Sequence, residues 1–405
     1  MIKVPLASTG FRQNEIEAVA RVLSSGNLTM GSEVAAFESE MAQYLGVEHF
    51  VMVNSGSSAN LLMIEALLRP SQGSGRMSSG DGVLVPAIAW PTTIWPLIQL
   101  GLTPVFVDID PNTLAMDLSE AKTAIKKFEG KITGIFPIHP LGLALQSEEL
   151  DSFAKEFNLT QINDVCESLG AWADSYHAGT KGLMSSFSFY FSHHITTMEG
   201  GGIATNELDL ANDLRSMRSH GWSRDRTDSR NWHQGFSHSD SKFVFVTTGY
   251  NVRPMEIQAA AGRTQLRSLG AFVDRRREIV QMLYRAIAGT SLRIIGYERF
   301  LLNPRSHSWM LVPIQITCDS GSKKRQDLLE SLEELNIETR PVLTGNFLSQ
   351  PAMRRIGPEP INPEDFPQAT KIAETSFLVS CHHDLTDSQI SHLGESLRKL
   401  ALSIF

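Results

Sequence analysis

The sequence predicts an α/β protein with a mostly parallel sheet and a second, smaller domain. Three observations support this prediction. Short β-rich runs alternate with helical patterns in the first half, the 405 residues are 42% hydrophobic and can bury a large core, and the pattern changes after Tyr284. Ligands of such sheets collect at the carboxyl ends of the strands.

The elements of the first half follow in order along the chain. A β-rich run at 49–53 enters the loop NSGSSAN and a helix with apolar periodicity at 59–68. The later elements are a strand at 82–86, a helix at 92–100, strands at 103–109 and 133–140, a helix at 147–157 and a strand at 160–164. The Gly- and Ser-rich stretch 71–82 is expected to be an exposed excursion.

The second half predicts a different arrangement. We expect a long helix over 255–283, a strand at 309–317, an amphipathic helix at 324–335 and a terminal helix at 387–402. The predicted domains are therefore residues 1–283, with the larger sheet and the connecting helix, and residues 284–405.

Composition excludes several classes of protein. A net charge of −8 with no basic stretch argues against nucleic-acid binding. Neither a signal peptide nor an apolar run of membrane-spanning length is seen, so we expect a cytoplasmic protein that does not enter membranes. Cys166, Cys318 and Cys381 are far apart without a CxxC pair, which suits reduced thiols and is too few for a four-cysteine iron–sulfur cluster.

Residues 188–201 read SFYFSHHITTMEGG, and this segment is the most specific motif of the chain. Together with SGSS at 55–58, TQIND at 160–164 and GYNVRP at 249–254, it resembles the DegT/DnrJ family of pyridoxal phosphate (PLP) dependent sugar aminotransferases and dehydratases. The resemblance implies the aspartate-aminotransferase-like architecture, PLP fold type I. It places His193 where most relatives carry the lysine that binds PLP covalently, as in a small subgroup of sugar 3-dehydratases.

The cofactor contacts can be argued from what PLP requires. Its phosphate suits backbone N–H groups at a helix N-terminus, for which Gly56 and Ser57 are candidates, and the resemblance adds the Ser188 hydroxyl. The pyridine nitrogen needs an acidic partner, which the family places at Asp164. Glu167 stands where relatives carry a group near the ring hydroxyl.

An aromatic ring stacked on the cofactor is expected from Trp90, with Trp95 as the alternative that would be a core residue. Asn251 in GYNVRP matches the asparagine that reaches the cofactor phosphate of a neighbouring subunit, which implies a homodimer with shared active sites. Arg253 and Arg340 are candidates for binding a carboxylate or a diphosphate, although either could be a structural ion pair. His220 is a further candidate for the substrate cleft, or a structural histidine.

An imidazole cannot anchor PLP, but it can move protons beside it. His193 is therefore the expected catalytic residue, with PLP or pyridoxamine phosphate (PMP) bound non-covalently, and Lys181 and Lys242 are not expected to replace the lysine. His194 is assigned no catalytic role, and no metal site is expected because His193 lacks further ligands nearby.

The resemblance implies a C3 dehydration of a nucleotide-linked 4-keto-6-deoxyhexose, GDP-4-keto-6-deoxy-D-mannose above all, with L-glutamate as amino donor. Three alternatives remain open: a sugar aminotransferase, a non-catalytic regulator, and the same dehydration on another nucleotide sugar.

Overall fold

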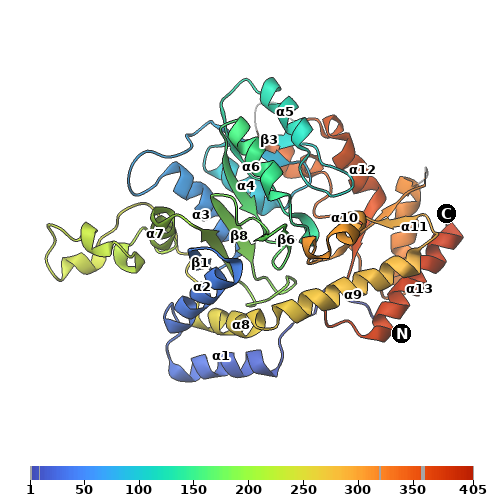
Figure 1. Cartoon of the computed structure of the whole chain (residues 1–405), viewed down its shortest axis with the longest axis horizontal. Helices are drawn as coiled ribbons and strands as arrows, with labels where there is room; N and C mark the ends of the chain where they lie inside the picture. The colour runs from blue at the N-terminus through green and yellow to red at the C-terminus, as the bar shows by residue number, and fades with distance from the viewer. Residues whose placement is uncertain (1, 9, 319–320, 357–360, 405) are drawn as a thin grey trace.

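A seven-stranded sheet forms the centre of the molecule in the computed structural model, which describes residues 2–8, 10–318, 321–356 and 361–404 (Figure 1). Its strand order is β1-β9-β8-β5-β4-β2-β3. The strands are β1 (His49–Val53), β2 (Gly82–Pro86), β3 (Thr103–Val107), β4 (Ile132–Ile135), β5 (Thr160–Asp164), β8 (Met184–Ser188) and β9 (Gly201–Thr205). The predicted strands of the first half are all present, although the strand predicted over 133–140 ends at Ile135, shortly before Pro137 removes a ladder donor.

Six of these strands run in the same direction. The pairs β2–β3, β2–β4, β4–β5 and β5–β8 are parallel, and β9 is antiparallel to both β8 and β1. Residues Val53, Asp164 and Ser188 therefore end their strands at one edge of the sheet. This arrangement confirms the predicted α/β class with a mostly parallel sheet.

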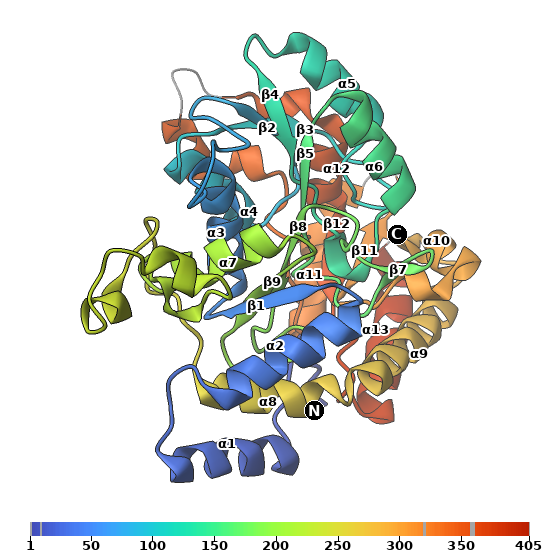
Figure 2. The same ribbon diagram turned by 60° about the vertical axis from the view of Figure 1, so that its left-hand side comes forward.

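Both faces of the sheet are covered by helices (Figure 2). Side chains such as Val51 and Ile162 pack in one apolar cluster with helix α3 (Gly56–Leu68), while Phe50 and Phe187 point to the other face and pack with helix α2 (Ser32–Leu45). The alternation follows from the two-residue period of a strand. The covering helices are α2 (Ser32–Leu45), α3 (Gly56–Leu68), α4 (Pro91–Gln99), α5 (Leu118–Lys127), α6 (Ser147–Glu156) and α7 (Leu208–Met217).

The long helix predicted over 255–283 is wrong, because two helices occupy this stretch. Helix α8 (Glu256–Leu266) ends before α9 (Leu269–Ile287) begins, and Ser268 is the N-cap residue of α9. The Ser268 side chain makes no capping hydrogen bond, but serine and Gly270 are both weaker helix formers than alanine or leucine. Helix α8 packs against α2 and against α1 (Gln13–Ser25), whereas α9 packs against α13 (Asp387–Ile404).

The C-terminal part contains a three-stranded antiparallel sheet, β10-β11-β12. Val4 near the N-terminus belongs to the same apolar cluster, so both ends of the chain contribute to this core. The predicted boundary after residue 283 lies inside α9, and the division into 1–283 and 284–405 stays a prediction. The elements are β10 (Leu292–Ile294), α10 (Tyr297–Leu302), β11 (Val312–Ile316), α11 (Gly321–Glu334), α12 (Pro367–Thr375) and β12 (Ser376–Val379).

Two connections depart from regular layers. The stretch 71–82 is mostly exposed and has no helix or strand before Gly82, as predicted, although Met77 is buried in the main core and Asp81 accepts a hydrogen bond from Thr133. Residues 220–248, which we call the arm, project from the body beyond α7 at the left of Figure 1. A short hairpin of β6 (Trp172–Ala173) and β7 (Tyr176–His177) completes the strands.

None of the described helices combines the length and apolar character that crossing a membrane requires.

Candidate active site

A cavity of about 690 Å³ opens at the edge where the parallel strands end. Strand ends, the N-terminus of α3 and residues from the C-terminal part surround it. Eight of the eleven predicted site residues line it: Gly56, Ser57, Trp90, Asp164, Glu167, Ser188, His193 and Arg340. The structure therefore brings together side chains that are up to 284 positions apart in the sequence.

The N-terminus of α3 forms one wall of the cavity. Ser55 is the N-cap residue, and its side-chain oxygen accepts a hydrogen bond of 3.1 Å from the Ser58 N–H. Gly56 lies so close to β8 that a Cβ atom there would stand 2.7 Å from the Ser188 Cβ. Free N–H groups, hydroxyls and the positive end of a helix dipole converge here, which suits a dianionic phosphate.

Asp164 lies at the floor of the cavity and is 4% exposed. Its Oδ2 accepts hydrogen bonds from Asn60 Nδ2 at 2.8 Å and Thr93 Oγ1 at 2.7 Å, and its Oδ1 accepts one from the Cys166 N–H at 3.0 Å. A carboxylate with three donors is fixed in orientation and still has lone pairs on Oδ1 for a further donor. The protonated nitrogen of a pyridine ring is such a donor.

Trp90 and Arg340 form the outer wall. Trp90 is the N-cap residue of α4 and is 46% exposed, and the Arg340 guanidinium lies 5.4 Å from the centre of its ring. Trp95 instead packs against Phe347 in the core, at 5.2 Å between ring centres. The exposed face of Trp90 is thus available for stacking.

Glu167 has a pKa raised to about 7. Burial is the main cause, and the nearby Asp164 charge adds to it, while the Leu141 N–H bond and Arg340 act in the opposite direction. A carboxyl group in this state can exchange a proton with a partner at neutral pH.

His193 follows the end of β8 and borders the cavity. Its Nδ1 has no hydrogen-bond partner among the described residues, and the Tyr190 ring stands edge-on at 6.1 Å. Burial, followed by the charges of Arg276 and Arg340, holds the pKa of His193 well below its usual value. The ring is therefore uncharged near neutral pH and can accept a proton.

No lysine of the described chain lines this cavity. Lys181 lies over the Tyr176 ring at 3.7 Å, and Lys242 belongs to a short 3-10 helix of the arm. His194 is turned into the protein interior, where it is 1% exposed.

The three remaining predicted residues lie outside the cavity of the single chain. Asn251 forms a β-bridge with Ser219, and the Arg253 guanidinium donates a hydrogen bond of 3.1 Å to the Ser219 hydroxyl. His220 has a left-handed backbone with φ of 64° and an exposed side chain. Together they form a small cluster at the base of the arm.

Several cavity residues were missed by the sequence analysis. Asn60 lies one helical turn after Gly56 on α3, and this spacing could have indicated that both face the strand ends. Tyr190, Phe191, Ser192 and Glu199 come from the same loop as His193, whereas Leu6 and Glu338 come from distant parts of the chain and gave no signal.

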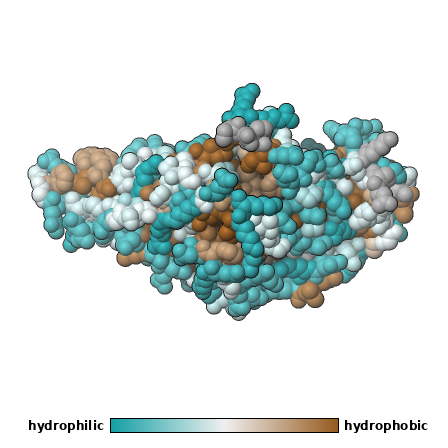
Figure 3. All heavy atoms as spheres, turned by 90° about the horizontal axis from the view of Figure 1, so that it is seen from above, coloured by the Kyte–Doolittle hydropathy of each residue, from teal (hydrophilic) through white to brown (hydrophobic). Residues whose placement is uncertain are grey.

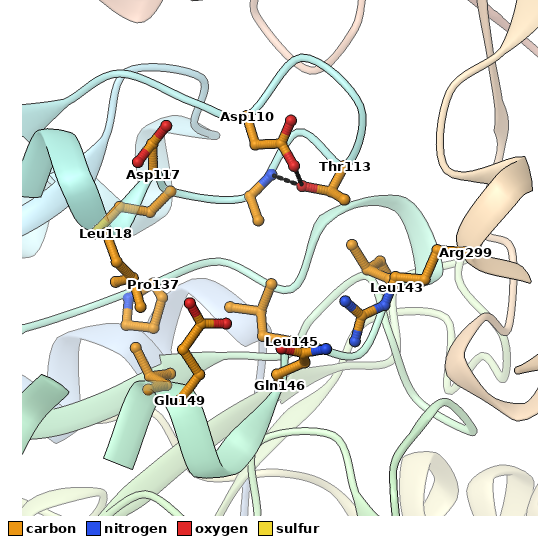
Figure 4. Close-up of a pocket in the computed structure, with 13 residues that line it drawn as sticks. Asp110, Thr113, Asp117, Leu118, Pro137, Leu143, Leu145, Gln146, Glu149 and Arg299 are labelled. Carbon is orange, nitrogen blue, oxygen red and sulfur yellow. Dashed lines mark hydrogen bonds between the residues drawn. The ribbon is translucent and has the colours of Figure 1, made fainter. Parts of the chain in front are cut away.

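A second, smaller cavity of about 250 Å³ lies elsewhere, between α5, α6 and α10 (Figure 4). Asp110, Glu149 and Arg299 border it together with aliphatic side chains. Asp110 accepts a hydrogen bond of 2.9 Å from the Thr113 hydroxyl. None of the predicted site residues belongs to it.

Comparisons with known proteins agree with this geometry. The chain matches the DegT/DnrJ/EryC1/StrS aminotransferase family over residues 10–398. It is 35% identical to the GDP-4-keto-6-deoxy-D-mannose 3-dehydratase of Yersinia pseudotuberculosis, covering 98% of this chain and 99% of that one. The E. coli enzyme of the same name, solved with hydrated PLP, is 34% identical with a TM-score of 0.87, covering 98% of this chain and 100% of that one.

A further structure of a GDP-4-keto-6-deoxymannose 3-dehydratase contains a trapped PLP–glutamate geminal diamine. It is 33% identical with a TM-score of 0.85, and the match again covers 98% of this chain and all of the other. The fold is that of the PLP-dependent aminotransferases. The chain is a member of the DegT/DnrJ/EryC1/StrS family.

Proposed function

We propose that this protein is a PLP-dependent sugar 3-dehydratase. Its substrate is a nucleotide-linked 4-keto-6-deoxyhexose, GDP-4-keto-6-deoxy-D-mannose in the first place, and L-glutamate is the amino donor. The observation that carries the proposal is His193 at the cavity wall, in a cavity whose described lining contains no lysine. The named relatives that share the chain's full length support the choice of substrate.

The cavity fits PLP by the chemistry of its walls. Gly56, Ser57 and Ser188 would hold the phosphate, and Asp164 would pair with the pyridine nitrogen. Trp90 would stack on the ring. When bound, PLP supplies an electron sink that lets a carbon–oxygen bond beside the amine-bearing carbon break.

His193 performs the proton transfers in this proposal. An uncharged imidazole removes a proton from carbon, and the resulting imidazolium returns a proton to the departing C3 hydroxyl, so that water leaves. Because an imidazole cannot form the covalent bond that a lysine would, it does not displace the bound sugar before elimination. Glu167, with its pKa near 7, is suited to share a proton with the ring hydroxyl.

Arg340 is positioned for the anionic part of either substrate. Its guanidinium borders the cavity beside Trp90 and can bind the carboxylate of glutamate or a diphosphate in a bidentate manner. The same chemistry applies to Arg253 and His220 if the cavity is completed by a second chain.

A homodimer with shared active sites explains the cluster at the base of the arm. Asn251 is exposed in the single chain, and the arm presents Trp222 stacked on Phe243, with ring centres 5.4 Å apart. Phe236, Phe243 and Phe245 are 53%, 65% and 55% exposed, and Figure 3 shows hydrophobic side chains on the arm. Such a patch is typical of a protein–protein contact, and a second copy would bring Asn251 to the neighbouring phosphate.

The proposal is tested by product analysis. The purified protein is incubated with PLP, glutamate and GDP-4-keto-6-deoxy-D-mannose, and in parallel with other nucleotide-linked 4-keto-6-deoxyhexoses. We expect 2-oxoglutarate, ammonia and a sugar that has lost the C3 oxygen, and we expect His193→Asn to abolish the loss. A 4-amino sugar that retains the C3 hydroxyl would instead identify an aminotransferase.

A further inference from the structure

A buried guanidinium lies behind the loop that carries His193. Arg276 on α9 is 0% exposed, and no carboxylate of the described chain lies within ion-pair distance of it. Burying an arginine without a paired carboxylate is costly, so its retention calls for a compensating interaction. Main-chain oxygens compensate the Nη groups, whereas Nε has no hydrogen-bond partner among the described residues.

Arg276 connects three segments around the cavity. Its Nη1 donates to the carbonyl oxygens of Trp309 at 3.1 Å and Met310 at 2.8 Å, and its Nη2 donates to the His193 carbonyl at 3.5 Å. Trp309 has a left-handed backbone with φ of 51°, which costs energy for a non-glycine residue and needs support. Met310 itself borders the cavity.

Four histidines lie near this cation, together with the thiol of Cys381 and the carboxylate of Asp384. The charge of Arg276 lowers the pKa values of His193, His194, His382 and His383, in each case after the larger effect of burial. His194 and His383 have ring nitrogens without described hydrogen-bond partners. One cation thus stands near four imidazoles, and its charge adds to the larger effect of burial in lowering their pKa values.

We propose that Arg276 is a positioning residue for His193. Its buried guanidinium anchors the Trp309–Met310 main chain, reaches the His193 carbonyl through one long contact, and sets a fixed positive charge beside the His193 loop. The role rests on the proposed function of His193 as a base, because only an uncharged imidazole accepts a proton.

Other charged and titratable groups also face these two residues. The groups around His193 are Arg340, Tyr190, His194 and the cavity carboxyls of Asp164, Glu167 and Glu199. The groups around Arg276 are Cys381, His382, His383 and Asp384, with Arg12 behind Asp384. Asp384 is paired with Arg12 at 2.6 Å, so its charge is largely compensated.

The first test needs only the wild-type protein without PLP. Histidine carbons are labelled, His193 is assigned by comparison with His193→Asn, and its NMR signal is followed with pH. The signal is expected to stay that of a neutral ring through pH 6. A protonation midpoint at the ordinary value of 6.5 would overturn the proposal.

The second test compares Arg276→Gln with Arg276→Lys, and uses Arg275→Gln as the matched control on the same helix, where Arg275 only pairs with surface acids. Two quantities are measured against pH: the His193 signal and the rate at which glutamate converts bound PLP to PMP. Arg276→Gln should move both midpoints to higher pH, and below them the rate falls about tenfold for each unit moved.

Arg276→Lys should keep the wild-type midpoints, and Arg275→Gln should change neither quantity. Equal loss of rate in Arg276→Gln and Arg276→Lys with unmoved midpoints would show a purely structural role and overturn the proposal. If Arg276→Gln does not fold, Arg276→Met replaces it as the uncharged variant, with the same expected shift of both midpoints. The NMR result is independent of any sugar, so a shifted midpoint with no dehydration would refute the proposed substrate chemistry and leave the role of Arg276 standing.

Discussion

Replacing Gly56 by alanine tests whether the close approach of α3 to β8 builds the phosphate site. The new Cβ would lie 2.7 Å from the Ser188 Cβ and 3.0 Å from the Cys166 Sγ, closer than such atoms pack. Overpacking of this kind costs about 1–3 kcal/mol, whereas removing a glycine from a helix gains about 0.4–1 kcal/mol through the unfolded chain. We therefore expect a net destabilisation of about 1–2 kcal/mol.

The same displacement moves the α3 N–H groups away from Ser188, so PLP binding should weaken about tenfold for each 1.4 kcal/mol of lost interaction. Denaturant unfolding and a PLP titration measure the two effects. Gly270→Ala is the matched control, because this glycine also lies in the first turn of a helix and a Cβ there meets nothing within 4 Å. A Gly56→Ala protein with wild-type stability and PLP affinity would refute the reasoning.

Three further predictions concern the cavity and the arm. The pKa of Glu167 is raised in the folded state, so its protonated carboxyl stabilises the fold at low pH, and this contribution is lost as the pH rises from 4.5 to about 7. Glu167→Gln should therefore flatten the fall in the free energy of unfolding over this pH range. Urea unfolding at several pH values measures the effect, and identical pH curves for both proteins would contradict it. Asp164→Asn should weaken PLP binding about ten- to hundredfold by removing a charge-assisted hydrogen bond, and unchanged affinity in the titration would exclude the pairing with the ring nitrogen. Phe243→Ser should shift the sedimentation of the protein toward that of a monomer. Leu302→Ser, which changes an exposed residue outside the arm, should not. Equal dimerisation of Phe243→Ser and wild type would show that the arm does not form the dimer contact.

The order of strands and helices could be predicted well in the first half, since buried parallel strands read as short apolar runs such as residues 82–86. Elsewhere the structure departs from the elements that the apolar pattern predicts, at residues 268 and 309. The helical period continues across Ser268, but one helix ends at Leu266 and the next begins at Leu269, with two weak helix formers, Ser268 and Gly270, at the junction. The strand predicted from residue 309 begins only at Val312, because Trp309 adopts a left-handed backbone that cannot take part in strand pairing.

The residues that follow strand ends could be predicted as site residues because their place in the fold is set by local sequence. Asp164 and Ser188 end β5 and β8, and both border the cavity. Arg276 could not be found this way, since its contacts with the loops at 193 and 309 depend on how α9 packs against distant segments. Asn251 shows a further limit: its predicted partner is on another chain, and one sequence does not contain that contact.

Treating the protein and PLP with borohydride, followed by mass measurement of the intact denatured chain, tests the central claim most directly. Borohydride makes a covalent link between a lysine and PLP permanent. With His193 in the place of that lysine, we predict that the chain keeps its unmodified mass, while a His193→Lys protein gains the mass of the reduced cofactor. A wild-type chain that carries the reduced cofactor on a lysine would contradict the account.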